Sequence, residues 1–300
     1  MPLATEPTLI VITGPTGSGK TALSIKVAQA LKCHILSADS RQLYRDIPIG
    51  TAAPTKEELV TAPHHFVGTL ELNDYYSAAQ YETDALALLE KLWQENCYAV
   101  MCGGSMMYID AVCKGIDELP TITPEIRNRA MAMYANGGLP LLQETLQRID
   151  PAYYEQVDKN NHKRLVHAIE ITMQAGVPYS SLRTGLIKQR NFRIIKVAIN
   201  YERDMLFDRI NRRVDNMLEN GLLQEARKVY KLRHLNSLNT VGFKELFAYF
   251  DGTMDYETAV ARIAKNTRVY AKKQLTWMKK DETIHLLNPE TAFDDLMNLI

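Results

Sequence analysis

The chain has 300 residues, a formal net charge of zero and a 46% share of apolar residues. This length buries a substantial core, in one large domain or in a main domain that carries a smaller one, and the absence of low-complexity tracts excludes a disordered or fibrous protein. No apolar stretch approaches the roughly 20 residues that span a bilayer. The first residues also lack a signal-peptide pattern, so we expect a cytoplasmic protein with no membrane partner.

The cysteines indicate reduced thiols. Cys33, Cys97, Cys102 and Cys113 form no C-x-x-C pair and no cluster with histidines. We therefore expect buried, unpaired thiols in a reducing compartment, and neither a disulfide framework nor a structural zinc module.

The neutral total hides an uneven distribution of charge. Residues 258–280 contain no acid but carry several bases, residues 171–201 also lack acids, and acids gather between residues 57 and 95. Because local fields rather than totals attract polyanions, a basic face would suit a nucleic acid. Ordinary solvated helix faces would produce the same pattern, so charge alone leaves both interpretations open.

Strand and helix patterns alternate along the first 115 residues. Apolar runs predict strands, and apolar residues at helical spacing predict helices; the expected elements are a strand at Leu9–Thr13, a helix at Thr21–Leu31, a strand at His34–Ser37, a helix from the cap Ser77 to Asn96 and a strand at Tyr98–Cys102. This alternation predicts a parallel sheet, whose ligands gather at the carboxyl ends of the strands.

Strand patterns then stop until residue 191. Short helices are expected at Pro124–Tyr134, Pro140–Ile149 and Asn161–Gln174, followed by a strand at Phe192–Asn200 and helices at Asp204–Asn220, Leu223–Lys231 and Tyr256–Lys279. The predicted fold class is therefore α/β, a parallel sheet flanked by helices with a small all-helical insertion. We expect a core of residues 1–120 and 191–300 and an insertion domain of residues 121–190.

A phosphate-binding loop follows the first predicted strand. It consists of Gly14, Pro15, Thr16, Gly17, Ser18, Gly19, Lys20 and Thr21 and fits G-x-x-x-x-G-K-[ST] in full. Glycines let backbone N–H groups point inward, and the following helix adds its positive end. Lys20 would bridge phosphate oxygens, and the Thr21 hydroxyl would lie on or near Mg²⁺.

The remaining candidates differ from those of an ordinary nucleotide hydrolase. Such an enzyme would usually have a metal-binding Asp at the end of a strand, whereas the strand at Tyr98–Cys102 ends in Gly-Gly-Ser and the best acid is Asp39. Taken alone, Asp39 fits either a turn residue or a catalyst. One face of a later helix carries Arg209, Arg212, Arg213 and Asn216, which either meet water or clamp a phosphate.

Several stretches together resemble the tRNA dimethylallyltransferases, the bacterial tRNA isopentenyltransferase family. They run in order across nearly the whole chain: GPTGSGKT (14–21), SADSRQLYRDIPIGTAAP (37–54), PHHFVG (63–68), GGSMMYIDAVCKGID (103–117), HKRLVHAIE (162–170), RINRRVDNMLENGLLQEA (209–226), NTVGFKEL (239–246) and TRVYAKKQLTWMK (267–279). Two positions depart from the family pattern, since Gly17 stands where Ala is more usual and Ser105 where Thr is usual. Ser105 keeps the hydroxyl and lacks only a methyl group.

The resemblance implies a prenyl transfer to tRNA within a P-loop NTPase-like fold. The phosphate loop would hold the diphosphate of dimethylallyl diphosphate with Mg²⁺, and N6 of adenosine 37, next to the anticodon, would attack the allylic carbon. Lys20, Asp39, Ser105 and Arg213 would be catalytic. The base must leave the stack of the anticodon loop to react.

The resemblance also implies a set of tRNA contacts. They comprise Asp39, Ser40, Arg41, Gln42 and Ser105 near the reacting base, with Arg127, Lys163, Arg164, Leu165, Val166 and His167 in the insertion. The partners would be the anticodon stem-loop and dimethylallyl diphosphate, and we expect a monomer.

Three other functions share part of this pattern. A small-molecule kinase would have the same loop and sheet, but it would consume ATP and would usually have an Asp where Gly-Gly-Ser follows the third strand. An isopentenyltransferase of free AMP or ADP would leave the insertion and the basic segments without a purpose. A non-enzymatic tRNA-binding module would leave Asp39 and the complete phosphate loop unexplained.

Overall fold

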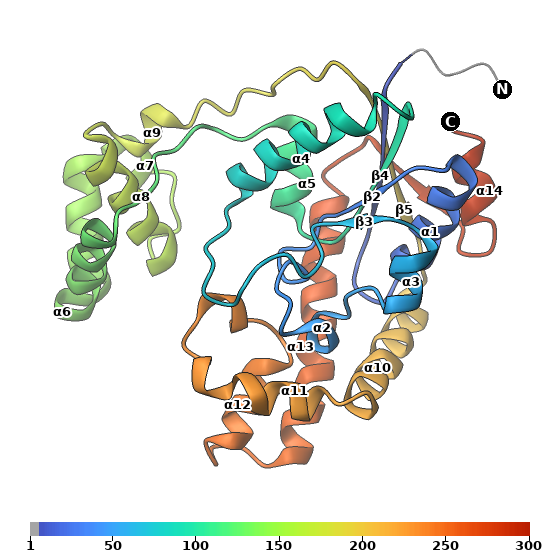
Figure 1. Ribbon diagram of the computed structural model, residues 1–300. Helices are drawn as coiled ribbons and strands as arrows, with labels where there is room; N and C mark the ends of the chain where they lie inside the picture. Colours follow the sequence, from blue (N-terminus) through green and yellow to red (C-terminus); the bar gives the residue numbers. More distant parts are fainter. Residues whose placement is uncertain (1–5) are drawn as a thin grey trace. The chain divides into compact units, whose positions relative to one another are not determined.

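The computed structural model describes residues 6–300. The chain divides into two compact units: a sheet unit, formed by the residues up to Cys113 together with Gln189–Ile300, and a helical unit, Lys114–Lys188. Figure 1 labels the elements of both units. Within the described residues, no helix combines the length and the apolarity that a bilayer crossing requires.

Six parallel strands form one sheet with the order β3-β2-β4-β1-β5-β6. Their bounds are β1 Thr8–Thr13, β2 Ile35–Ser37, β3 His64–His65, β4 Tyr98–Cys102, β5 Arg193–Ile199 and β6 Ile284–Leu287. The central strand is β1, in which Thr8 pairs with Tyr98 on one side and with Arg193 on the other. The α/β fold expected from the sequence is thereby confirmed.

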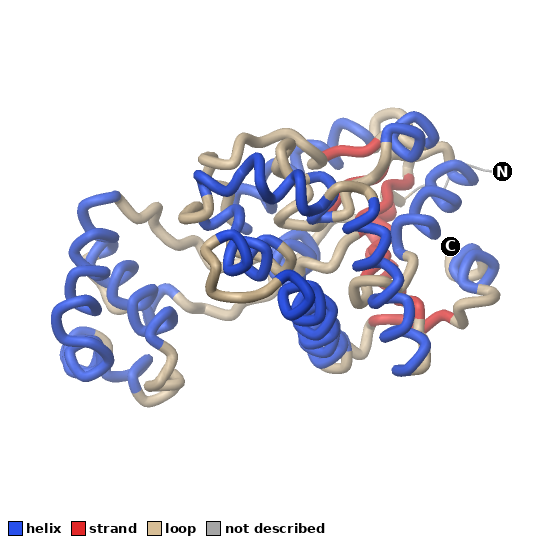
Figure 2. Tube along the Cα trace, turned by 90° about the horizontal axis from the view of Figure 1, so that it is seen from below, coloured by secondary structure: helices blue, strands red, loops and turns tan. Residues whose placement is uncertain are grey.

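Helices cover both faces of this sheet (Figure 2). Because side chains alternate along a strand, Ile10 and Ile12 of β1 pack in a cluster with α1 (Lys20–Leu31) and α14 (Ala292–Met297), whereas Leu9 and Val11 pack in a second cluster with α4 (Ala78–Leu92) and α5 (Met106–Lys114). All four β1 side chains are fully buried, and each such side chain stabilises the fold by about 1.5–3 kcal/mol. Burial on both faces explains the uninterrupted apolar run of β1.

A third apolar cluster lies among the later helices of the sheet unit. These are α10 Arg203–Glu219, α11 Leu222–Val229, α12 Phe243–Phe250 and α13 Tyr256–Met278, with the short 3-10 turns Tyr230–Leu232 and Asn236–Leu238. Apolar side chains of this cluster pack these helices against the segment around α2 (Pro48–Thr51). The short helix α3 (Lys56–Thr61) comes next in the chain. The buried carboxylate of Glu225 on α11 accepts hydrogen bonds from the N–H groups of Ile49 and Gly50 at 2.8 and 2.7 Å. Chain segments distant in sequence are thus fixed to one another around the carboxyl end of the sheet.

The helical unit has its own core. Its helices are α6 Pro124–Ile149, α7 Pro151–Tyr154, α8 His162–Ala175 and α9 Tyr179–Leu182. The sequence predicts a break in α6, and the backbone does leave helical geometry at Gly138 (φ 60°), two residues before Pro140. Apolar side chains of α6 and α8 bury one another and form a closed cluster. At its two ends, Lys188 N–H donates to the carbonyl of Lys114 at 2.8 Å, which holds the first and last residues of the unit together.

Most predicted elements form within one to three residues of the expected bounds. β4 and the start of α13 agree with the prediction, and Ser77 caps α4 by accepting the N–H of Gln80. No element was predicted for β3, β6, α2, α3, α5, α12 or α14. Most of these are short, and β3 has only two residues, too few to show a periodicity.

Candidate active site

The phosphate loop connects the central strand β1 to α1. Gly14, Gly17 and Gly19 have φ angles of 143°, 82° and 84°, which residues other than glycine rarely adopt. A Cβ on Gly17 would lie 3.1 Å from Ile210 Cγ1 of α10, so the loop is also tightly packed from that side. No acidic residue lies in the first turn of α1, and the positive end of the helix faces the loop without a carboxylate to neutralise it.

Lys20 occupies the base of this loop. Its Nζ donates to the carbonyl of Pro15 at 2.8 Å. Loss of hydration lowers the pKa of Lys20 to about 8, with a smaller lowering from Arg213 and opposing effects from Cys102 and Asp39. A weakly hydrated cation that is held by one carbonyl is a ready partner for a phosphate oxygen.

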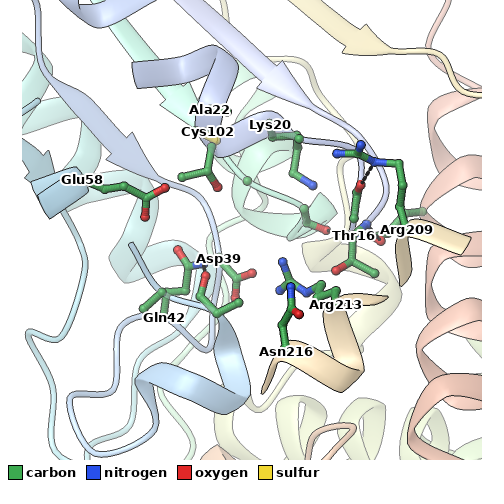
Figure 3. A pocket seen from close by; sticks show the side chains of 18 of the residues that line it. Thr16, Lys20, Ala22, Asp39, Gln42, Glu58, Cys102, Arg209, Arg213 and Asn216 are labelled. Carbon is green, nitrogen blue, oxygen red and sulfur yellow. Dashed lines mark hydrogen bonds between the residues drawn. The ribbon is translucent and has the colours of Figure 1, made fainter. Parts of the chain in front are cut away.

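A pocket of about 610 Å³ opens over the loop. Its lining contains residues 16–22 except Ser18, together with Asp39, Gln42, Gly103, Gly104, Arg209, Arg212, Arg213, Asn216, Tyr270 and Gln274. Figure 3 shows Lys20, Asp39 and Arg213 directed toward one shared space. The carboxyl ends of β1, β2 and β4 therefore supply one pocket, as the parallel sheet predicts.

Helix α10 forms the side of the pocket opposite the sheet. Arg209 Nε donates to the carbonyl of Gly17 at 2.8 Å, a contact drawn in Figure 3. Arg213 is half-buried, and burial lowers the pKa of its guanidinium against an opposing effect of Asp39. Ile210 and Val214 are buried on the other face of the helix. Arg209 is half-buried as well, but its Nε is already bonded to the loop, and Arg212 lines the same pocket but is exposed.

Asp39 follows β2 and lies both in a turn and in the wall of the pocket. Its Oδ1 accepts the N–H of Arg41 at 2.9 Å, which makes a tight turn, and its side chain also lines the pocket. The next residue is fixed as well, because Ser40 N–H donates to Ser105 Oγ at 2.9 Å. The turn therefore holds the Asp39 carboxylate in place in the wall of the phosphate pocket.

Gln42 completes the polar wall next to Asp39. It accepts a hydrogen bond from Ser37 Oγ at 2.8 Å and donates to the carbonyl of Ala52 at 3.0 Å. Both ends of the amide are thereby fixed, so Gln42 holds the chain that leaves α2 against the end of β2.

A second cavity, of about 410 Å³, lies on the other side of Ser40 and Ser105. Five tyrosines line it, so we call it the aromatic cavity: Tyr44, Tyr75, Tyr76, Tyr108 and Tyr270. Tyr270 also lines the first pocket, so the two cavities share one wall. Neither this aromatic group nor Gln274 was predicted from the sequence. Tyr270 and Gln274 lie in the stretch TRVYAKKQLTWMK, but scattered tyrosines give no periodic pattern.

Within the helical unit, the predicted tRNA contacts on α8 differ in solvent exposure. Lys163, Arg164 and His167 are exposed, whereas Leu165 and Val166 are buried, with 0% and 7% of their surface accessible. The two apolar side chains belong to the core of this unit and are not open to a ligand on the exposed face. Arg127, on α6, is exposed and pairs with Glu170 at 3.6 Å.

The described residues offer oxygen ligands for a metal but no dense cluster. No group of three or more His, Cys, Asp or Glu side chains suited to a metal ion occurs in residues 6–300. Thr21 and Asp39 both line the phosphate pocket and present a hydroxyl and a carboxylate. Magnesium binds proteins through one or two such oxygens and takes the rest from phosphates and water.

Comparisons with known proteins agree with this site. The family model described as IPP transferase matches residues 42–281. A tRNA dimethylallyltransferase 2 of Parabacteroides distasonis is 55% identical over 94% of both chains, and a tRNA dimethylallyltransferase 1 of Phocaeicola vulgatus is 54% identical over 94% of both. The crystal structure of a tRNA isopentenylpyrophosphate transferase from Bacillus halodurans is 31% identical and superposes with a TM-score of 0.70, over 98% of this chain and 95% of that chain. The chain belongs to the IPP transferase family, the tRNA dimethylallyltransferases.

Proposed function

We propose that this protein transfers the dimethylallyl group of dimethylallyl diphosphate to N6 of adenosine 37 in tRNA and releases diphosphate. Family membership supports the reaction. The observation that carries the assignment of residues is the single pocket that joins a phosphate loop, a carboxylate and a half-buried arginine. Such a pocket places a diphosphate next to a proton acceptor.

The diphosphate would be held by the loop amides, Lys20 and Arg213. As the bond between the allylic carbon and the diphosphate oxygen breaks, its electron pair goes to the leaving group, so negative charge grows there. N–H groups at the start of α1 and two cations already point at this place. Preorganised donors of this kind stabilise a developing charge more than mobile water does.

Asp39 would act as the base toward the acceptor adenosine. N6 of adenosine forms the new bond to carbon and loses one proton, which the carboxylate of Asp39 accepts. The hydrogen bond from Arg41 N–H holds one carboxylate oxygen in place. Ser105 would keep this side of the pocket in position through its bond to Ser40 N–H.

The aromatic cavity is the natural place for the extruded base. It borders Ser40, Arg41 and Ser105, and it shares Tyr270 with the phosphate pocket. A base removed from its stack is commonly held between aromatic side chains.

Magnesium fits the donor set. Thr21 would hold the ion together with oxygens of the diphosphate, and the bound ion would neutralise charge on the leaving group.

The exposed side chains Arg127, Lys163, Arg164 and His167 of the helical unit would contact tRNA. Lysine and arginine on one surface supply the salt-sensitive phosphate contacts of RNA-binding proteins. A tRNA substrate and four free thiols also fit a cytoplasmic enzyme, and we propose that it acts as a monomer.

One close contact argues against a kinase. At the end of β4, where a nucleotide hydrolase would usually carry its metal-binding Asp, a Cβ on Gly103 would lie 2.1 Å from the carbonyl oxygen of Ala38. No side chain fits at this position. The metal-binding carboxylate of a nucleotide hydrolase therefore does not fit at position 103, at the end of β4.

The test is a prenyl-transfer assay with the purified protein, Mg²⁺ and labelled dimethylallyl diphosphate. Parallel reactions offer unmodified tRNA, the same tRNA with guanosine at position 37, or AMP. We expect label only on the tRNA that has adenosine 37. Label on AMP would place the protein among the free-nucleotide enzymes, and label on the guanosine tRNA would contradict the assigned acceptor.

A further inference from the structure

A buried glutamine links the two halves of the reaction site. Gln274 lies on α13, far along the chain from the phosphate loop, and only 3% of it is exposed. Burying an amide without partners costs free energy. The contacts of its two amide atoms therefore explain why this residue lies in the interior.

Both ends of the Gln274 amide are bonded. Oε1 accepts the N–H of Thr16 in the phosphate loop at 2.9 Å, and Nε2 donates to the carbonyl of Gly104 at 3.0 Å. One partner is a donor and the other an acceptor, so only one orientation of the amide satisfies both. The side chain therefore joins the loop after β1 to the loop after β4.

The absence of a side chain at Gly104 makes room for the Gln274 amide. A Cβ on Gly104 would lie 2.2 Å from Gln274 Nε2. Any side chain at Gly104 would push the amide away, so the second glycine of the Gly-Gly-Ser motif is needed for close approach. Ser105 follows directly and holds Ser40 N–H, beside Asp39.

Under the proposed function, one end of Gln274 touches the loop that holds the diphosphate and the other touches the loop that precedes Ser105. We infer that Gln274 is a positioning residue that sets the spacing between the prenyl donor and the acceptor base. This inference rests on the proposed function. In a displacement, nitrogen, carbon and leaving oxygen must be aligned, and a misplacement of about 1 Å costs on the order of 100-fold in rate.

The test separates positioning from simple anchoring of α13. Gln274→Met keeps the volume of the side chain and removes both hydrogen bonds. We expect kcat to fall about 10- to 100-fold, while KM for each substrate changes by less than about 3-fold. The matched control is Leu275→Ala, because Leu275 packs against Leu206 and Ile210 and has no place in the link. This control should lower the midpoint of thermal unfolding but keep kcat close to that of the wild type.

A second variant keeps the inference testable if Gln274→Met folds poorly. In Gln274→Glu, an ionised carboxylate would face the Gly104 carbonyl, whereas a protonated one would restore a donor there and an acceptor for Thr16 N–H. The kcat of this variant, divided by that of the wild type at each pH, should therefore rise as the pH falls. The division removes the pH effects that the variant and the wild type share; the charged side chains around position 274 in the pocket are Lys20, Asp39, Glu58, Arg209, Arg212 and Arg213.

Three results would overturn the inference. They are a kcat of Gln274→Met within about 3-fold of the wild type, an equal loss of kcat in Leu275→Ala at equal loss of stability, or a flat pH ratio for Gln274→Glu. Failure of the proposed function is distinguishable, because the wild-type protein itself would then transfer no prenyl group.

Discussion

The phosphate pocket and the exposed face of α8 hold charged side chains in opposite ways. In the pocket, Lys20 and Arg213 are partly desolvated, and the backbone fixes Asp39. On α8, Lys163 and Arg164 are exposed to solvent. Fixed charges act on a barrier because they need no rearrangement during the reaction, whereas solvated charges attract a polyanion and depend on salt. We therefore expect changes in the pocket to affect the rate and changes on α8 to affect tRNA affinity.

The largest effect is expected from Asp39→Asn. The amide cannot take the proton from N6, so kcat should fall about 10³-fold, within the usual range for general bases. Binding of tRNA, measured by filter retention, should stay within about 2-fold because the Asn side chain still supports the turn. The control is Asp46→Asn, an exposed position outside the pocket lining. A parallel loss of binding and rate would make Asp39 a structural residue.

Next in size is the contrast between two adjacent arginines. Arg213→Ala should lower kcat about 100-fold, since it removes a desolvated donor at the developing charge. Arg212→Ala should change kcat by less than about 3-fold, because an exposed cation is screened by water. Initial rates at saturating substrates give both values. Equal losses in the two variants would show that the field of α10, not the placement of one guanidinium, assists the reaction.

The pH dependence should show the titration of Lys20. Its pKa is lowered to about 8, so the free enzyme carries the cation below that pH and loses it above. The kcat/KM for dimethylallyl diphosphate should therefore fall above about pH 8, by up to about tenfold per unit. Lys20→Arg stays charged and should remove this decline, whatever its activity. The same decline in Lys20→Arg would assign the titration to another group.

The smallest effect is expected on α8. The double variant Lys163→Ala and Arg164→Ala should weaken tRNA binding about 5-fold and reduce the slope of log affinity against log salt by about 0.7–0.9 for each lost contact. We expect kcat at saturating tRNA to stay the same. Arg148→Ala, which removes an exposed charge of α6 in the same unit, serves as the control. An unchanged salt slope would remove α8 from the interface.

Local patterns predicted the parts of the site that lie next to each other in the sequence. The phosphate loop follows from its own spacing, and the face of α10 follows from helical periodicity. All four polar residues predicted on that face line the pocket, although only Arg209 and Arg213 are half-buried and Arg212 and Asn216 are exposed. Exposure of the individual arginines depends on what packs against them, which periodicity does not report.

Long-range contacts lay beyond such patterns. Gln274 reads as one polar residue in a basic helix, and its two partners are found only when the loops after β1 and β4 are placed beside it. Leu165 and Val166 illustrate the reverse case. A matching motif included them among tRNA-contacting residues, whereas their side chains lie in the core of the helical unit.

The link between Thr16 and Gln274 joins positions 258 residues apart. During synthesis, the phosphate loop leaves the ribosome early, but the helix that completes its surroundings emerges near the end. Contacts of such long range also close slowly once the chain is free. A nascent chain that lacks α13 would therefore carry a full phosphate-loop motif and the exposed face of α8 without a finished site, so it could hold tRNA before it could transfer a prenyl group.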